Sequence, residues 1–422
     1  MNRRVVITGI GVVAPDAIGT KNLWTLLTEG RTATRLIRTF DPSPFRSRIA
    51  AAVDFDPVRE GLTGAEAGRL DRAAQFALVA AREALADSGL VPDPDGAHRL
   101  GVSVGNAVGC TQRLEGEYRK LSDDGARWLV DHTRGHPNLY DFFVPSSLAA
   151  EIAWLVGAEG PATVVSAGCT SGVDSLGYAC DLIREGTADV MIAGGTDAPI
   201  APITVACFDA IKATSPRNDA PEEASRPFDR TRNGFVLAEG AAILVLEELE
   251  SARRRGARVY AEIAGFASRS NAYHMTGLRS DGAEMAAAIT AALDEARMAP
   301  SEIDYVNAHG TATKQNDRHE TAAFKRSLGA HAYDVPISSI KSMIGHSLGA
   351  VGAIEVAATA LAIENDVVPP TANLREADPE LDLDYVPLTA REQRVDRAVT
   401  VASGFGGFQS AMVLAGVEER AA

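Results

Sequence analysis

A single cysteine lies where the sequence predicts that a strand passes into a helix. Residues 163–165 form a β-branched run typical of a buried strand, and an apolar helical pattern begins just after Cys169. Free N–H groups and the helix dipole favour a thiolate at such a position, so we expect a lowered pKa. Small neighbours leave room for a substrate. The alternative, a buried and inert cysteine that only packs, stays open on this evidence.

Two turns that contain histidine offer proton-handling partners for such a thiol. A strand predicted at residues 304–308 ends at His309, and small and hydroxyl residues follow it. A second strand is predicted to end near Lys341, and His346 is predicted to open an Ala-rich helix. A histidine at a helix N-terminus tends to stay neutral, which suits a hydrogen-bond donor to a developing oxyanion. Either histidine alone is better explained as a loop residue, whereas the two turns together modestly favour chemistry.

A competing interpretation makes Ser347 the nucleophile. Residues 345–349 read Gly-His-Ser-Leu-Gly and match the G-x-S-x-G turn of serine hydrolases. That class needs a histidine later in the chain, and none follows Ser347. Metal chemistry is also disfavoured, because the spacings of His and Cys fit no zinc pattern and no H-E-x-x-H is present.

Short β-branched runs alternate with helical patterns along the whole chain. This alternation predicts an α/β protein whose sheets are covered by helices on both faces. The best candidate boundary lies near residues 253–256, where an Arg-rich helix end precedes a new strand. It divides the chain into residues 1–254 and 255–422. The uncharged run 398–417 contains glycines and serines, so we expect strand, turn and strand there and no membrane span.

The composition excludes several classes of protein. The 41 basic and 56 acidic residues among 422 give a formal net charge of −15, which argues against nucleic-acid binding. Four cysteines make no disulfide framework, so a reducing compartment fits best and we expect a cytoplasmic protein. The N-terminal residues begin like a strand and lack the core of a signal peptide.

Taken together, several motifs in the same order resemble the β-ketoacyl synthases of the thiolase superfamily. Further motifs resemble the ketosynthase α subunits of bacterial type II polyketide synthases. The first set lies at residues 4–11, 168–172, 226–229, 233–235, 309–311, 341–349 and 404–407; the second lies at 273–276, 314–320 and 382–388.

The resemblance implies a five-layered αβαβα fold with two related halves and one active site near their junction. It implies a decarboxylative Claisen condensation in which Cys169 carries the acyl chain as a thioester. Backbone N–H groups of Cys169 and Phe405 would form the oxyanion hole, and the Phe405 ring would gate the acyl chamber. His309 and His346 would stabilise the enolate. Lys341 would hold the histidines, together with Glu355 and Asp317.

The same resemblance implies no bound cofactor, because the phosphopantetheine arm arrives on an acyl carrier protein. Thr276, Thr311 and Thr313 match positions that contact this arm. Ala312 departs from the glycine common in the family, and its methyl group is expected to narrow the passage. The carrier protein is expected to be acidic, so an acidic chain needs a local basic docking surface; the candidates are Arg69, Arg72, Lys212 and Arg217.

The expected partner subunit is a chain-length factor that forms a heterodimer with this chain, with strand 163–168 at the interface. Two alternatives within the family stay open. One is an elongating ketosynthase of type II fatty-acid synthesis. The other is a non-condensing subunit that determines chain length, which the intact Cys169, His309, Lys341 and His346 disfavour. Outside the family, a serine acyltransferase that uses Ser347 is the remaining alternative.

Overall fold

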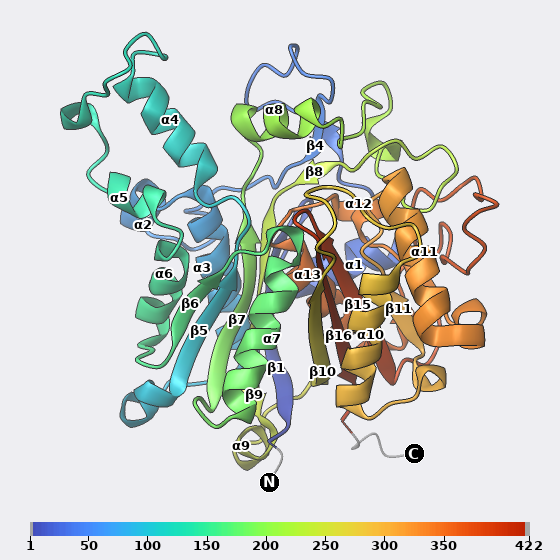
Figure 1. Ribbon diagram of the computed structural model, residues 1–422. Coiled ribbons are helices and arrows are strands. Elements are labelled where there is room, and N and C mark those ends of the chain that lie inside the picture. The colour runs from blue at the N-terminus through green and yellow to red at the C-terminus, as the bar shows by residue number, and fades with distance from the viewer. Residues whose placement is uncertain (1–2, 418–422) are drawn as a thin grey trace.

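One bent sheet of eleven strands runs through the whole molecule in this computed structural model, which describes residues 3–417 (Figure 1). Its strands follow the order β12-β11-β15-β16-β10-β1-β9-β7-β5-β6, and β2 pairs with β1 beside this path. The strands are β1 (Val5–Ala14), β2 (Ala17–Ile18), β5 (Leu100–Gly105), β6 (Ala162–Val165), β7 (Val190–Asp197), β9 (Gly240–Glu248), β10 (Ala261–Ser270), β11 (Tyr305–Asn307), β12 (Ile337–Ser338), β15 (Arg397–Gly404) and β16 (Phe408–Ala415).

The strand directions read the same from both ends of this sheet. From β6 inward the pairings are parallel, parallel, antiparallel and antiparallel, and from β12 inward the same series recurs. The two series meet where β1 pairs with β10 over a short antiparallel stretch. The sheet therefore consists of two halves with matching topology, as the sequence resemblance implied.

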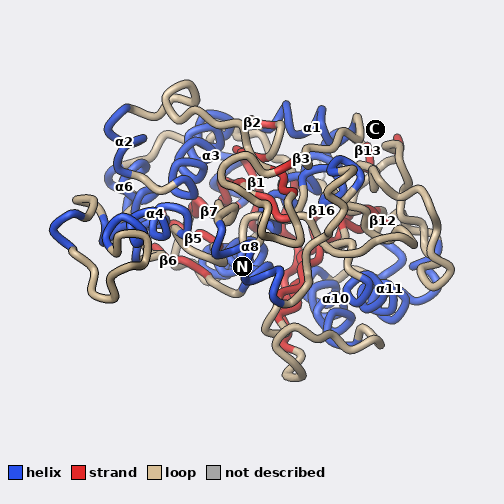
Figure 2. Tube along the Cα trace, turned by 90° about the horizontal axis from the view of Figure 1, so that it is seen from above, coloured by secondary structure: helices blue, strands red, loops and turns tan. Residues whose placement is uncertain are grey.

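Helices complete five layers, which confirms the expected fold class. One outer layer packs on the first half of the sheet, and another packs on the second half (Figure 2). Between the halves lie two helices that pack against each other and against strands of both halves. The outer helices are α3 (Arg72–Ser88) and α6 (Ser147–Val156) on one side and α10 (Ala283–Ala296) and α11 (Lys314–Leu328) on the other; the central pair is α7 (Ser171–Arg184) and α13 (Val351–Asn365).

Small residues let the central helices approach each other closely. A Cβ atom on Gly172 would lie 2.6 Å from the backbone nitrogen of Ala353, and one on Gly352 would lie 2.7 Å from a methyl group of Val173. Thirteen residues of α13 are buried, so this helix has no solvent face. The contact fixes the N-terminal ends of both helices relative to each other, and the candidate site lies at those ends.

Several smaller elements surround this framework. They are α1 (Thr20–Thr28), β3 (Arg35–Leu36), β4 (Ile49–Ala51), α2 (Gly64–Arg69), α4 (Thr111–Leu121), α5 (Leu139–Phe143), α8 (Pro202–Ala210), β8 (Leu237–Ala238), α9 (Leu249–Arg254), α12 (Lys341–Ile344), β13 (Val367–Val368) and β14 (Arg391–Glu392), with single 3₁₀ turns η1 (Pro94–Arg99), η2 (His132–Arg134), η3 (Gly168–Thr170), η4 (Pro221–Glu223), η5 (Pro300–Glu302) and η6 (Gly329–Tyr333).

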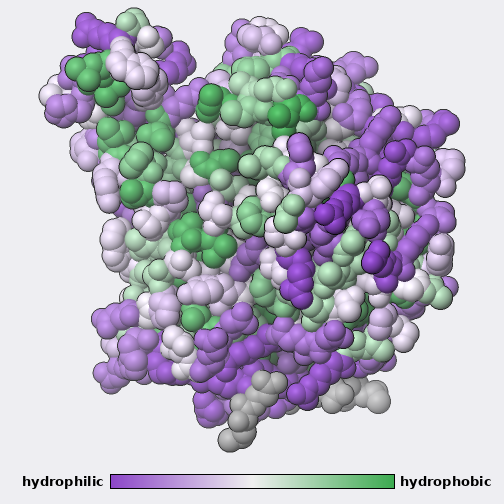
Figure 3. All heavy atoms as spheres, viewed as in Figure 1, coloured by the Kyte–Doolittle hydropathy of each residue, from purple (hydrophilic) through white to green (hydrophobic). Residues whose placement is uncertain are grey.

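Residues 107–146, here called the arm, project from the first half of the molecule. The arm contains α4 and α5 and stands apart from the sheet at the upper left of Figure 1. Figure 3 shows hydrophobic surface on this projection. Its large exposed apolar side chains are Tyr118, Trp128, Leu129, Tyr140 and Phe143.

The chain passes from the first half to the second between α9 and β10. This is where the sequence placed a boundary, and we propose residues 1–254 and 255–422 as the two halves; residues 1–2 and 418–422 lie outside the described part. The run 398–417 forms β15, a turn and β16, as expected. Within residues 3–417, no helix combines the length and the apolar character needed to cross a membrane.

Candidate active site

Cys169 lies in η3, between β6 and the first turn of α7, as the strand-to-helix prediction required. The backbone N–H of Phe405 donates a hydrogen bond to its sulfur and lowers the pKa of the thiol, as does the nearby Lys341 ammonium. Burial outweighs both effects and raises the pKa of the Cys169 thiol to about 12. The expected lowered pKa is therefore wrong, because the loss of water around the sulfur exceeds what the helix end and the cation supply.

His309 follows β11 and is held by a buried cation. The Nζ atom of Lys341 lies 3.3 Å from Nδ1 of His309 and is also bonded to Glu355. Lys341 and Glu355 are 1 % and 0 % exposed, so this ion pair has no contact with solvent. Burial and the Lys341 charge hold the pKa of His309 well below its usual value. Because an ammonium can only donate, Nδ1 accepts, and the proton of the neutral ring resides on Nε2.

His346 reaches the same tautomer through the backbone. The N–H group of Leu348 lies 3.3 Å from Nδ1 of His346, so Nε2 carries the ring proton here as well. Burial and Lys341 hold the pKa of this ring well below its usual value, which agrees with the predicted neutral histidine. The predicted position at a helix start is wrong. α12 ends at Ile344 and α13 begins at Val351, so His346 lies between them, where its backbone bonds to Val236 and Ala238.

The two histidine rings lie at right angles, with their centroids 5.3 Å apart. Together with Cys169 and Phe405 they line one cavity. Thr276, Thr311 and Thr313, which the resemblance assigns to the pantetheine arm, also line this cavity. The remaining lining is largely apolar and includes Phe208, Phe235, Met275, Leu278 and Leu348. The site thus combines a thiol, two neutral hydrogen-bond donors and an apolar chamber.

Glu320 supports this site, although the sequence reasoning gave it no role. Its carboxyl group accepts the backbone N–H groups of His309 at 2.5 Å and Gly310 at 2.8 Å. Burial raises its pKa to about 8. Glu320 lies on the face of the 314–328 helix that is buried in the core. A buried carboxyl group needs hydrogen-bond partners, so a glutamate at such a position was the feature that could have indicated its role.

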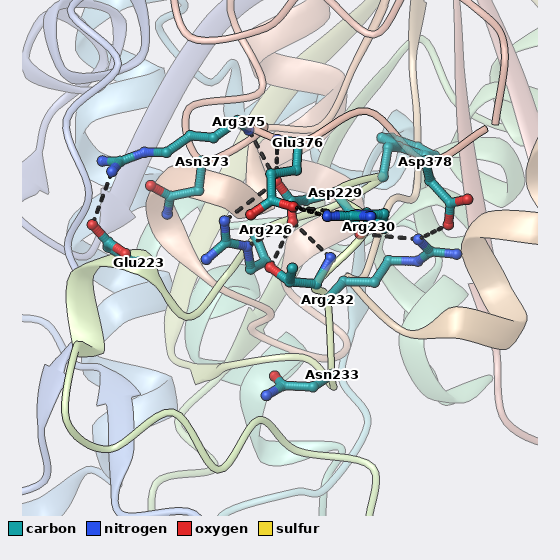
Figure 4. A network of polar contacts seen from close by, with 12 residues as sticks. Glu223, Arg226, Asp229, Arg230, Arg232, Asn233, Asn373, Arg375, Glu376 and Asp378 are labelled. Carbon is teal, nitrogen blue, oxygen red and sulfur yellow. Dashed lines mark hydrogen bonds and ion pairs between the residues drawn. The ribbon is translucent and has the colours of Figure 1, made fainter. Parts of the chain in front are cut away.

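Asp317 does not face Lys341, so its expected role is corrected. It accepts the N–H of Phe228 at 2.8 Å and pairs with Arg232 at 3.2 Å. Arg232 is itself 1 % exposed and binds Asp378, within a network that joins residues 226–233 to 373–378 (Figure 4). Asp317 also lies close enough to the Thr311 N–H to accept it. Asp317 therefore stabilises the turn that follows His309.

Ser347 is buried, and its hydroxyl group has no hydrogen-bond partner among the described residues. It does not line the cavity that holds Cys169 and the histidines. No base is therefore in position to activate this serine.

Two of the four docking candidates serve internal ion pairs. Arg69 binds Glu151, and Arg72 binds Glu239 at 2.7 Å and 3.0 Å; both acids are buried. Arg217 lies 3.8 Å from Glu223. Lys212 is exposed, and no ion pair to it occurs within residues 3–417. Of the four candidates, Lys212 alone has no acidic partner among the described residues.

Ala312 does not narrow the passage, contrary to the expectation. It is fully buried, is absent from the cavity lining and adopts φ +63°. Its methyl group is instead a source of backbone strain, because residues with a Cβ atom are disfavoured in the left-handed region that glycine adopts easily.

Two family models match nearly the whole chain. The N-terminal domain of β-ketoacyl synthase matches residues 2–252, and its C-terminal domain matches residues 260–375. The oxytetracycline polyketide β-ketoacyl synthase 1 of Streptomyces rimosus is 70 % identical and covers 98 % of this chain and 97 % of its own. The tetracenomycin polyketide synthase ketoacyl synthase alpha subunit of Streptomyces glaucescens is 66 % identical over 99 % and 98 %.

Solved structures agree with these matches. A type II PKS acyl-carrier protein in complex with its ketosynthase bound to the hexaketide superimposes with a TM-score of 0.92 at 38 % identity, over 99 % of this chain and 100 % of that one. The ishigamide ketosynthase/chain length factor gives 0.89 at 35 % identity, over the same shares.

The chain belongs to the β-ketoacyl synthase family, whose members are acyltransferases. Within that family it is a ketosynthase alpha subunit of the type II polyketide kind, as the full-length relatives at 60 to 70 % identity establish. The fatty-acid alternative is less close, since a 3-oxoacyl-[acyl-carrier-protein] synthase 2 from Coxiella burnetii shares 41 % identity.

Proposed function

We propose that Cys169 is the nucleophile of a decarboxylative condensation, with His309 and His346 as donors to the enolate. The observation that carries this proposal is the shared cavity, in which one thiol faces two neutral imidazoles beside the Phe405 loop. Lys341 and Glu355 are positioning residues, because Lys341 contacts His309, Glu355 contacts Lys341, and neither lines the cavity.

In the first step, the Cys169 sulfur attacks the thioester carbonyl of an acyl chain on a carrier protein. The bond from that carbonyl to the pantetheine sulfur breaks, and the acyl chain stays on the enzyme. With a pKa of about 12, the thiol still carries its proton when the substrate arrives, so the proton leaves during the attack. It passes to the departing pantetheine sulfur, and the charges balance.

In the second step, a malonyl thioester loses CO₂ and becomes an enolate. Both imidazoles carry a proton on Nε2, so both can donate to the enolate oxygen within the cavity. The enolate carbon attacks the Cys169 thioester, whose oxygen is held by the N–H groups of Cys169 and Phe405. The carbon–sulfur bond then breaks, and the freed thiolate takes up one proton. Removing one such donor typically lowers kcat by about 10²–10³.

The mass of the intact protein after exposure to an acyl-carrier protein tests this proposal. We expect an added acyl mass on wild type and on Ser347→Ala, and none on Cys169→Ala. An adduct that survives in Cys169→Ala and vanishes in Ser347→Ala would reverse the assignment in favour of a serine acyltransferase.

We further propose that this chain pairs with a chain-length factor and accepts substrates from an acyl carrier protein, because the similar structures carry those names. The strand β6 supports the pairing, since it is the last strand of the sheet and its outer edge has no strand beside it among the described residues. The apolar arm offers additional contact area.

Substitution on β6 tests the pairing. Val164 packs on the core, so its neighbour Val165 points to the opposite face, where it is only half-buried. We expect Val165→Arg to prevent co-purification with a chain-length factor while leaving the melting temperature of the separate subunit nearly unchanged. Normal co-purification of this variant would place the interface elsewhere.

A further inference from the structure

One wall of the cavity is made by a loop in which Thr276 alone has so far been given a role. Residues 271–282, here called the mouth loop, join β10 to α10. The four consecutive residues 275–278 line the cavity, while Tyr273 and Met275 are 59 % and 72 % exposed. The loop is therefore thin, with the cavity on one side and solvent on the other.

The mouth loop is attached on its first side to the Phe405 turn. The N–H of Gly406 donates to the carbonyl of Met275 at 2.6 Å, and the N–H of Asn271 donates to the carbonyl of Gly407 at 2.9 Å. Any displacement of the loop would therefore reach the backbone that holds Phe405.

Two side chains of α11 hold the loop on its other side. Gln315 Nε2 donates to the carbonyl of Leu278 at 3.0 Å, and His319 Nδ1 lies 2.6 Å from the carbonyl of Arg279. These two carbonyls come at the end of the cavity-lining stretch. Nearby, a Cβ atom on Gly282 would lie 2.3 Å from the Ala323 nitrogen, so the loop rejoins the helix in close backbone contact.

Packing alone does not explain the histidine at position 319. The residue is fully buried, and its Nε2 has no partner among the described residues. A buried, unpaired ring nitrogen is unfavourable, so an apolar side chain would suit a purely packing role better. What the histidine supplies is the Nδ1–H bond to the Arg279 carbonyl.

We propose that His319 and Gln315 are positioning residues that fix the mouth loop and thereby set the passage through which the carrier-borne substrate reaches Cys169. This inference rests on the proposed function in that the cavity is taken as the substrate's route. Neither residue takes part in the chemistry. Their effect should therefore appear in substrate binding and in local loop order, and little in turnover.

Substitutions that remove the donors and keep the size test the proposal. We expect Gln315→Met and His319→Leu each to raise KM for malonyl-carrier protein about fivefold, the effect of one lost hydrogen bond, with kcat within about twofold. His319→Asn keeps an N–H at the Nδ1 position and should restore most of the loss. Arg318→Gln, on the same helix but paired with Glu380, is the matched control and should behave as wild type.

Amide hydrogen exchange supplies a readout that is independent of activity. We expect faster exchange confined to residues 275–282 in Gln315→Met and His319→Leu, with the rest of the chain unaffected. Unchanged KM and unchanged loop exchange in both variants would overturn the inference. If His319→Leu fails to fold, loop exchange in Gln315→Met decides the question, because Gln315 also lines the cavity and its substitution acts on KM directly. If wild type fails to acylate Cys169, the proposed function fails. The exchange measurement still tests whether Gln315 and His319 hold the mouth loop.

Discussion

At the scale of single residues, the site is governed by one buried charge. Besides burial, the Lys341 charge lowers the pKa of both histidines. It also offsets part of the rise that burial causes in the pKa values of Cys169 and Glu355. Burial and this ammonium together keep the histidines neutral, and the ammonium fixes the tautomer of His309. Its pair with Glu355 is shielded from water, where losing one partner is far worse than losing both.

We expect Lys341→Met to lower the free energy of unfolding by about 3–5 kcal/mol, because it leaves Glu355 buried without a counterion. The double variant Lys341→Met/Glu355→Gln should recover most of that stability and none of the malonyl decarboxylation. Denaturant unfolding and release of CO₂ measure the two effects. If the double variant regained decarboxylation, the proposed role of Lys341 in orienting His309 would be wrong.

The sequence singled out three groups that the structure places around one cavity, but it misjudged some of their surroundings. Residue types and local patterns pointed to Cys169, His309 and His346, which the cavity brings together. The burial that raises the pKa of Cys169 and the pairing of Asp317 with Arg232 both depend on segments distant in the chain, which no local pattern relates to them.

At the scale of elements, α11 does more than cover the sheet. Its first two turns place Gln315 on the mouth loop, Asp317 on Arg232 and Glu320 on the His309 turn. The sequence singled out residues 314–320 only as a family motif and predicted no helix there. The 3.6-residue helical period points these side chains in different directions, so one helix can serve three contacts. The sequence predicted that a helix begins at His346. The structure instead has an irregular segment between α12 and α13, and the local pattern did not show it.

The turn between β11 and α11 stores strain at Ala312. We expect Ala312→Gly to raise the free energy of unfolding by up to about 1 kcal/mol, because φ +63° is easy for glycine and costly for alanine. KM for the carrier-borne substrate should stay unchanged, since the methyl group does not reach the cavity. Urea unfolding and steady-state kinetics measure both; a lowered KM would restore the idea of a narrowed passage.

At the scale of the whole molecule, the five layers place several carboxyl groups out of reach of water. Burial raises the pKa of Asp197 and Glu355 to about 7 and that of Glu320 to about 8. The α/β class could be predicted from alternating strands and helices, and the five layers from the family resemblance. The burial of these carboxyl groups could not be predicted, because it follows from the packing of the two halves against each other.

These groups determine how stability depends on pH. Their pKa is higher in the folded than in the unfolded chain, so the folded state binds more protons between pH 4.5 and 8, and stability falls as the pH rises through that window. We expect the urea midpoint to fall from pH 6 to pH 8, and to fall less in Glu320→Gln. Equal midpoints at both pH values would show that these carboxyl groups are ionised throughout.

The matching topology of the two halves has a consequence for how the site is assembled. In each half the central helix follows the outermost strand. The segment before α7 holds the thiol, and the equivalent segment before α13 holds Lys341 and His346. Neither half therefore contains all the groups of the site, which exists only where the two halves meet.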